Sequence, residues 1–273
     1  MNMKSLGQSE ESRGVILFAF NTAEINYIKI AENCVKLIKK HLNLPVTLIT
    51  NENCEIENCS VVHYTQTPFY NTRPGGAGKE WKNVDRYLAY ELSPYDTTLL
   101  IDCDYYIFNN NLLKYFDVVE DYLLTKEQLF TSAITLGTMG DFHIDQRWAT
   151  LTLFKKTQRS KLFFELVKRV QTNYRYYASL YSIKQKNYRN DHAFTIAHSI
   201  LNGYCNDIEF CYPETLIAIS ENVDDLEIRD ASIIIRTENK SYVLPKTNLH
   251  FISKNFLLSE KCQTIIEEYV SGT

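Results

Sequence analysis

Two carboxylates stand two residues apart at the end of an apolar run in the segment 97–108. Asp102 and Asp104 flank Cys103, and in an extended chain the side chains at i and i+2 share one face. Both acids are therefore predicted to point the same way while Cys103 packs behind them. They would repel each other unless a cation lay between them, and Mg²⁺ or Mn²⁺ takes carboxylate oxygens as ligands and phosphate as a further partner. This position is predicted to be a metal and diphosphate site.

An Asp-x-Asp triplet can also be a solvated strand end with no ligand. Here it is the only such triplet in the chain, and the strand that it ends follows a helix-like segment. Ligands of open α/β sheets bind at the carboxyl ends of strands, which favours the metal interpretation.

Positive charge precedes this strand. Lys79, Lys82 and Arg86 fall on one face of a helix predicted over 81–92, where they could meet a diphosphate or a leaving group. A solvated helix surface is the alternative. Three glycines at 75, 76 and 78 match neither a Walker loop nor a dinucleotide fingerprint, but they could hinge Lys79 over a substrate; a plain surface loop explains them equally well. Arg86, nearest to the acids, is the strongest of the three candidates.

His250 and Lys254 lie four residues apart in a short apolar run near the C-terminus. A lone histidine of this kind is often a packing residue. Beside Lys254, however, a neutral imidazole could complete an Asp-Asp metal site while the ammonium neutralises charge on a departing diphosphate.

Asp191 is predicted to begin a helix over 191–201, with Asn190 as its cap. Capping alone could explain both residues. If Asp191 is functional, it could bind sugar hydroxyls or act as a general base toward an attacking hydroxyl, with Asp141 and Asp145 in reserve.

Hydrophobic periodicity predicts the elements that position these residues. Strands are predicted at 15–20, 45–50, 60–64, 97–102 and 148–154, and helices at 22–41, 81–92, 112–124, 161–177 and 191–201. This order implies an α/β fold with a mostly parallel, mixed sheet and helices on both faces. We expect a flexible N-terminus at 1–13, one domain at 14–256 and a C-terminal helix at 257–273.

The composition bounds the class of protein. The chain has 273 residues, 45% of them hydrophobic, and a formal charge of −4. No stretch is apolar enough to span a bilayer, and no signal-like N-terminus is present, so we expect a cytoplasmic protein without membrane insertion. Seven cysteines without a Cys-x-x-Cys pair predict reduced thiols rather than a zinc site.

The stretch 155–189 is strongly basic. Ten lysines and arginines face one acid, Glu165, and five tyrosines are interspersed, at 174, 176, 177, 181 and 188. A solvated helix face is the default explanation. Basic residues mixed with aromatics also suit a surface that binds phosphodiesters, so DNA is a candidate partner.

Taken together, the segments 15–21 and 81–108, Asn190-Asp191 and His250 resemble nucleotide-diphospho-sugar glycosyltransferases of the GT-A fold. The block Leu-Ser-Pro-Tyr-Asp-Thr-Thr-Leu-Leu-Ile-Asp-Cys-Asp-Tyr at 92–105 is most similar to that of small glycosyltransferase-like proteins of large tailed bacteriophages. The resemblance implies a Rossmann-like GT-A fold and a metal-dependent hexosyl- or pentosyltransferase in the cytoplasm of a phage host. It also implies Mn²⁺ or Mg²⁺ as cofactor and a nucleotide-sugar donor, with a UDP-sugar preferred.

By this resemblance Asp104 would ligate the metal, Asp102 would contact the ribose or the metal's second side, and Phe20 with Asn21 would lie beside the nucleobase. His250 with Lys254 is similar to a shortened His-x-x-Gly-x-x-Lys element that lacks its glycine. The phage setting and the basic stretch suggest DNA modification, with a hydroxymethylated pyrimidine as acceptor. A glycan or protein acceptor, a nucleotidyltransferase and a non-catalytic binding protein remain open.

Overall fold

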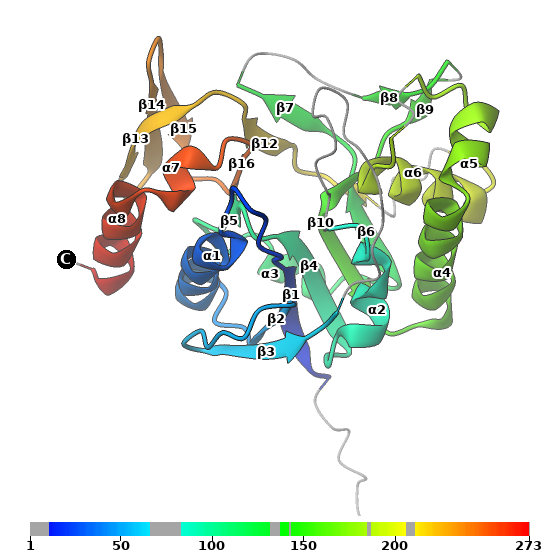
Figure 1. Cartoon of the computed structure of the whole chain (residues 1–273), viewed down its shortest axis with the longest axis horizontal. Helices are drawn as coiled ribbons and strands as arrows, with labels where there is room; N and C mark the ends of the chain where they lie inside the picture. The colour runs from blue at the N-terminus through cyan, green and yellow to red at the C-terminus, as the bar shows by residue number, and fades with distance from the viewer. Residues whose placement is uncertain are drawn as a thin grey trace, which may run out of the picture.

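The computed structural model describes residues 11–65, 83–131, 137–141, 143–184, 187–205 and 211–272. Its centre is a seven-stranded mixed sheet with helices on both faces, which confirms the predicted α/β class (Figure 1). In spatial order the strands are β11 (Cys211–Tyr212), β6 (Tyr122–Thr125), β10 (Trp148–Lys155), β4 (Thr97–Asp102), β1 (Arg13–Phe18), β2 (Val46–Thr50) and β3 (Cys59–His63). Strand β10 runs antiparallel to both of its neighbours, and the other neighbouring pairs are parallel.

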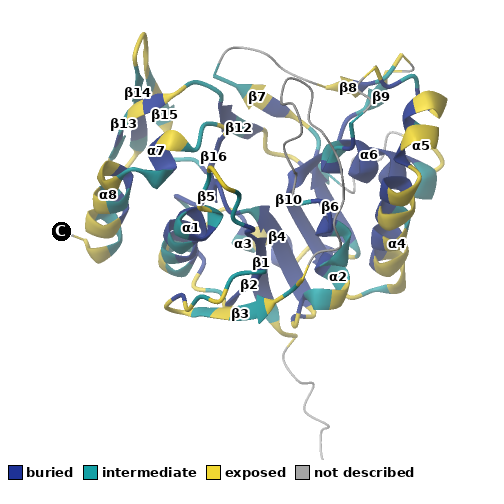
Figure 2. Ribbon diagram, viewed as in Figure 1, coloured by how far each residue is buried: buried dark blue, intermediate teal, exposed yellow. Residues whose placement is uncertain are grey.

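The sheet buries both of its faces. Along β1, Val15 and Leu17 join one hydrophobic layer with helices α1 (Tyr27–His41) and α8 (Glu260–Ser271). Ile16 and Phe18 join the opposite layer with α4 (Gln158–Thr172) and α6 (Asn190–Leu201). Figure 2 shows the central strands as buried and the outer sides of these helices as exposed. Strands covered on both faces typically have continuous apolar runs in their sequences, as 15–20 and 99–101 do.

Smaller sheets extend the structure beyond the central one. A four-stranded sheet joins β5 (Tyr105–Tyr106), β16 (Leu249–Phe251), β12 (Leu216–Ile219) and β7 (Gln128–Phe130). An antiparallel sheet of β13 (Val223–Ile228), β14 (Ser232–Thr237) and β15 (Ser241–Pro245) precedes α7 (Asn255–Leu258) and α8. A two-stranded ribbon joins β8 (Thr138–Met139) to β9 (Ile144–Asp145).

Several predicted helices differ from the structure. The helix predicted over 112–124 is wrong: only α3 (Leu113–Phe116) is helical, and residues 122–125 form β6, because a short apolar run fits a buried strand as well as a helix. The helix predicted over 81–92 begins, in the described part of the chain, with a 3₁₀ turn, η1 (Arg86–Leu88), and continues as α2 (Ala89–Leu92). The helix predicted over 161–177 is two helices, α4 and α5 (Tyr174–Leu180), separated at Asn173.

Helix α1 begins later than predicted because side chains take up the preceding amides. Asn26 caps it by accepting a hydrogen bond from Lys29 N–H at 3.1 Å, and Thr22 Oγ1 accepts one from Ile25 N–H at 3.0 Å. The start at 22 would have required these turn residues to be helical.

All seven cysteines are free thiols, as predicted. None of the helices in the described residues is both long enough and apolar enough to cross a membrane.

Candidate metal centre

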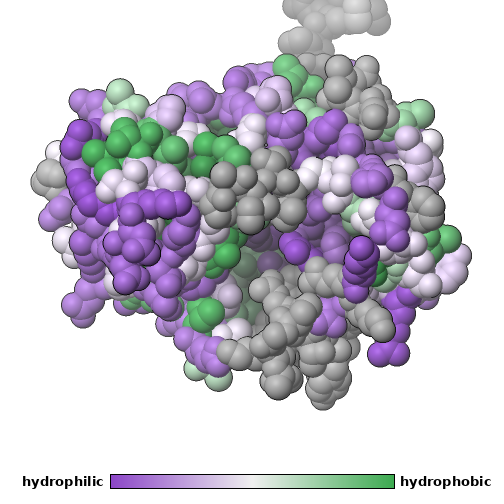
Figure 3. Space-filling model, turned by 90° about the horizontal axis from the view of Figure 1, so that it is seen from above, coloured by the Kyte–Doolittle hydropathy of each residue, from purple (hydrophilic) through white to green (hydrophobic). Residues whose placement is uncertain are grey.

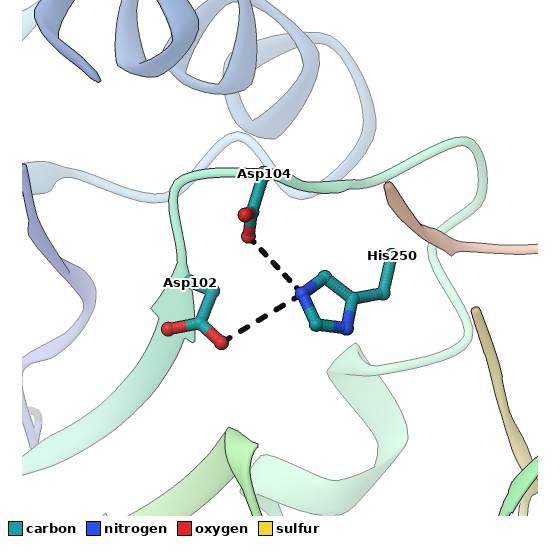
Figure 4. A group of neighbouring side chains, drawn as sticks. All are labelled: Asp102, Asp104 and His250. Carbon is teal, nitrogen blue, oxygen red and sulfur yellow. Dashed lines mark ion pairs between the residues drawn. The ribbon is translucent and has the colours of Figure 1, made fainter. Parts of the chain in front are cut away.

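The two acids meet a histidine that lies far away in the sequence. Asp102 is the last residue of β4, Asp104 lies in the following turn, and His250 lies in β16. Strand β16 pairs with β5 so that His250 stands opposite Tyr105, and Phe251 N–H donates to the Asp104 carbonyl at 3.0 Å. These backbone bonds hold His250 against the turn. Figure 4 shows the three side chains pointing toward one another.

The two acids converge for a different structural reason from the one predicted. The strand was predicted to continue through both acids, but β4 ends at Asp102 and the chain turns before β5 enters a different sheet. The acids therefore do not share a strand face. The turn and the pairing with β16 bring them together, while Cys103 is buried, as predicted.

One donor atom from each residue faces a common point. His250 Nε2 lies 3.2 Å from Asp104 Oδ1 and 3.9 Å from Asp102 Oδ2 (Figure 4). One ligand atom from each of the three residues can be chosen so that all lie within 4.8 Å of one another. Two carboxylate oxygens and one imidazole nitrogen are a donor set that suits a divalent cation.

The remaining carboxylate oxygens are held by cationic side chains. Arg86 Nη1 donates to Asp102 Oδ1, and Lys254 Nζ pairs with Asp104 Oδ2. These contacts fix Asp102 Oδ1 and Asp104 Oδ2. The other oxygen of each acid faces His250. Partners of this kind orient metal ligands.

Two buried atoms of the cluster make no hydrogen bond of good geometry among the described residues: Asp104 Oδ1, whose near neighbour is His250 Nε2 at 3.2 Å, and His250 Nδ1. A buried carboxylate oxygen that lacks a well-aligned donor costs free energy, so its place in a three-residue donor set fits a bound cation. Asp102, Asp104 and His250 could therefore hold Mn²⁺ or Mg²⁺.

The electrostatics keep Asp104 ionised. Burial alone would raise the pKa of its carboxyl, but the Lys254 ammonium and His250 outweigh burial and lower the pKa well below its usual range. Lys254 is itself anchored, because its Nζ donates to the carbonyls of Phe251 at 2.6 Å and Ile252 at 2.9 Å. Asp104 is thus a deprotonated ligand at neutral pH.

Arg86 lies where the sequence placed it, near the acids, but it contacts a different group from the one expected. Its side chain is 1% exposed, and besides Asp102 its Nη2 donates to the Thr150 carbonyl at 3.4 Å. The guanidinium was predicted to meet a diphosphate. In the structure it binds Asp102, a candidate metal ligand, and no pattern in the sequence indicates that pairing.

The Asp191 carboxylate is hydrogen-bonded to strand β10 of the central sheet. Its Oδ1 accepts from Ala149 N–H at 3.0 Å and its Oδ2 from Arg189 Nη2 at 2.7 Å. Burial would raise its pKa, but Arg189 and the Ala149 amide outweigh burial and lower it. Both oxygens are engaged, which suits an orienting role better than that of a free base.

The cap predicted for this helix is wrong. Asn190 is the first residue of α6, and Arg189 is its cap, without a capping side-chain bond. Asn190 instead accepts from Tyr188 Oη at 2.9 Å and donates to the Asn83 carbonyl at 2.8 Å.

The remaining predicted site residues follow the end of β1, whose Phe18 pairs with Asp102, or lie outside the described residues. Phe20 is 3% exposed and packs near Phe18, and Asn21 Oδ1 accepts from Ile28 N–H at 3.2 Å. Lys79 and Lys82, with the three glycines before them, lie outside the described residues.

Asp141 and Asp145, the alternatives to Asp191, each pair with a lysine. Asp145 lies 2.9 Å from Lys126 Nζ, and Asp141 lies 4.0 Å from Lys184 Nζ.

The basic stretch does not form the aromatic surface that its composition suggested. Three of its five tyrosines, at 174, 181 and 188, are buried in the core, whereas Tyr176 is 64% exposed. Exposed lysines and arginines remain along α4 and α5, on the side of the sheet opposite α1 and α8 (Figure 1). The interleaved tyrosines are mainly packing residues.

The carboxyl ends of β1 and β4 point toward the face that Figure 3 shows from above. That face is hollowed near its centre, and hydrophilic side chains border the hollow. Figures 1 and 3 thus place the ligand-binding end of a parallel sheet beneath a depression.

No protein-family model and no curated protein matches the sequence. Among solved structures, the chain is similar to the glycosyltransferase GlyE of Streptococcus pneumoniae TIGR4, with 13% sequence identity and a TM-score of 0.38. The similarity covers 75% of this chain and 45% of that chain, so this chain spans less than half the length of that relative.

Proposed function

We propose that this protein is a metal-dependent glycosyltransferase of the GT-A type, which moves a sugar from a nucleotide-diphosphate sugar to a hydroxyl acceptor. One observation carries the proposal: at the carboxyl end of β4, Asp102 Oδ2 and Asp104 Oδ1 both face His250 Nε2, while Arg86 and Lys254 hold the other two oxygens. A cation site at the ligand-binding end of an α/β sheet suits a diphosphate.

In this proposal Asp102, Asp104 and His250 hold Mn²⁺ or Mg²⁺. When bound, the ion stabilises the negative charge of a diphosphate leaving group. The chain's own residues do the positioning: Arg86 fixes Asp102, and the hydrogen bonds of Lys254 to two backbone carbonyls keep an ammonium beside Asp104. That ammonium adds positive charge where the diphosphate would lie.

The donor and acceptor assignments extend the same proposal. We assign a UDP-sugar as donor, with its base near Phe20 and Asn21, which follow β1 at the carboxyl edge of the sheet. Asp191, fixed between Ala149 and Arg189, would orient donor or acceptor hydroxyls. Lys79 would add positive charge from its own segment.

As acceptor we propose DNA with a hydroxymethylated pyrimidine, in a phage-encoded enzyme; the exposed basic residues of α4 and α5 could contact the DNA phosphates. Turnover on such DNA should then fall steeply as salt rises, because phosphate contacts are lost. Salt-independent activity, or equal activity on free nucleosides, would instead favour a glycan, protein or other small acceptor.

The test is calorimetric titration of the metal-free protein with Mn²⁺, then with UDP-glucose and other nucleotide sugars. Mn²⁺ should bind with one site and strengthen nucleotide-sugar binding, and at 100 times its Kd it should stabilise the fold by about 2.7 kcal/mol. Asp104→Asn should abolish both effects. Asp230→Asn, which removes the same charge from an exposed turn, should change neither.

The proposal is wrong if Asp104→Asn leaves metal-dependent donor binding and turnover intact. Release of pyrophosphate from a nucleoside triphosphate, without transfer or hydrolysis of any nucleotide sugar, would show a nucleotidyltransferase instead.

A further inference from the structure

A cavity lies away from the candidate metal centre. It measures about 510 Å³ and is lined by residues of β9, α5, α6 and the connections next to them, which lie together on one side of the molecule in Figure 1. None of its lining residues belongs to the Asp102, Asp104 and His250 cluster. Ligand cavities commonly measure about 300–1,000 Å³, so it can hold a small organic molecule.

A buried arginine without a charged partner lines this cavity. The Arg147 side chain is 2% exposed, yet its Nε and Nη1 have no hydrogen-bond partner, and within the described ranges no carboxylate pairs with it. Its backbone is fixed, because its N–H donates to Thr195 Oγ1 at 2.8 Å and its carbonyl accepts from the same hydroxyl at 3.3 Å. Within the described residues this guanidinium is therefore held in place without a paired acid, which is costly unless a ligand pairs with it.

The other titratable groups of the cavity do not neutralise this charge. Asp145 lines it, but its carboxylate pairs with Lys126 Nζ at 2.9 Å. His198 is hydrogen-bonded to Asn202 Nδ2 at 2.9 Å, and burial, with Arg147 and Arg159 nearby, lowers its pKa to about 3, so it is neutral at pH 7. Among the described residues, one positive charge therefore remains in the lining of the cavity.

We propose that this cavity binds a small molecule through a carboxylate or phosphate group, with Arg147 as the main contact. A guanidinium presents a planar fork of donors that fits either oxyanion. The apolar surfaces of Leu180, Tyr181 and Tyr204, which also line the cavity, would contact the carbon frame of the ligand. The site stands independently of the proposed glycosyltransferase reaction.

The test is calorimetry in metal-free buffer with EDTA, so that phosphate cannot bind through a cation at Asp104. The probes are inorganic phosphate, glucose 6-phosphate and glucuronate, with glucose as the neutral control. At least one oxyanion should bind saturably with one site, and glucose should not. Arg147→Met should weaken that binding at least tenfold, Arg147→Lys should weaken it less, and Arg229→Met on an exposed turn should leave it unchanged.

The probes also distinguish the source of the anion. Equal affinity for inorganic phosphate and glucose 6-phosphate supports a site for free phosphate. Tighter binding of glucose 6-phosphate or glucuronate supports a sugar-linked anion, because the carbon frame then contributes.

Thermal unfolding separates a ligand-binding arginine from a structural one. Arg147→Met should keep or raise the Tm, because it replaces an unpaired buried charge with an apolar side chain of similar length. If Arg147→Met does not fold, two other measurements test whether Arg147 binds the oxyanion: the affinity of Arg147→Lys, and an NMR titration of the wild-type His198 resonance with the same probes. The proposal is overturned if no oxyanion binds the wild type saturably, or if Arg147→Met binds as tightly as the wild type.

Discussion

Removal of Arg86 should destabilise the fold and also weaken metal binding. Its side chain is 1% exposed and that of its partner Asp102 is 23% exposed, so Arg86→Met leaves a carboxylate that water reaches only in part. Breaking a fully buried ion pair from one side costs about 3–5 kcal/mol, and the partial exposure of Asp102 places the expected loss at about 3 kcal/mol. For a chain of this size that loss corresponds to a fall in Tm of roughly 5–10 °C.

The matched control is a second arginine–aspartate pair with different burial. Arg13 Nη2 lies 2.7 Å from Asp117 Oδ1, but these side chains are 39% and 68% exposed. Arg13→Met should therefore cost under about 1 kcal/mol, since water solvates the aspartate that remains. Urea unfolding in EDTA measures both variants without a metal contribution.

Two further measurements distinguish the loss of the Arg86–Asp102 ion pair from the loss of packing around the Arg86 side chain. The double variant Arg86→Met with Asp102→Asn should be more stable than Arg86→Met alone, because it contains no unpaired carboxylate. Calorimetry should show Mn²⁺ affinity reduced about 10- to 100-fold in Arg86→Met, as expected when an orienting partner of a ligand is lost. Equal losses in Arg86→Met and Arg13→Met, or unchanged Mn²⁺ affinity, would refute this account of Arg86.

Three other perturbations test the structure. Lys254→Met should lower metal-free stability by about 3 kcal/mol, because the buried Asp104 loses its ammonium; unchanged stability in urea unfolding with EDTA would contradict the pairing. Gly14→Ala should cost about 1–3 kcal/mol in urea unfolding, because a Cβ would lie 2.4 Å from the buried ring of Tyr95; a neutral effect would mean that the ring can shift. Burial, aided by Arg189, lowers the pKa of His192 to about 4, whereas the unfolded value is near 6.5, so the unfolded state binds more protons between these values. The contribution of His192 to stability should be complete above pH 6.5 and fall by about 3 kcal/mol as the pH drops to 4. His192→Gln should reduce the loss of stability at low pH by this amount in urea titrations, whereas an unaltered profile would exclude His192 as a cause.

The α/β fold could be predicted because its strands are buried on both faces and its long helices are amphipathic. Residues 15–18 and 99–101 are apolar without interruption, and such runs indicate a strand that is covered on both faces. Residues 122–124 were assigned to a helix because a three-residue apolar run carries no period of its own. Only the neighbouring strands β10 and β11 decide that it is a strand.

The candidate site could be predicted in its residues but not in its contacts. Asp102, Asp104 and His250 were chosen from spacing and chemistry, and the structure brings them together. The pairing of Arg86 with Asp102 joins two elements through side chains, and no local pattern encodes it. The cavity at Arg147 was missed for the same reason, since a buried arginine without a partner is visible only once the surrounding chain is placed.

The pairing of β16 with β5 makes the candidate metal centre depend on a contact between distant parts of the sequence. His250 and Lys254 come from the last tenth of the sequence, and a two-residue ladder docks them beside a turn built about 150 positions earlier. Contacts of such long separation close slowly, because the loop entropy must be overcome before they form. Cation affinity would therefore report whether the C-terminal strand has docked, and a nascent or partly unfolded chain would keep two aspartates but no site.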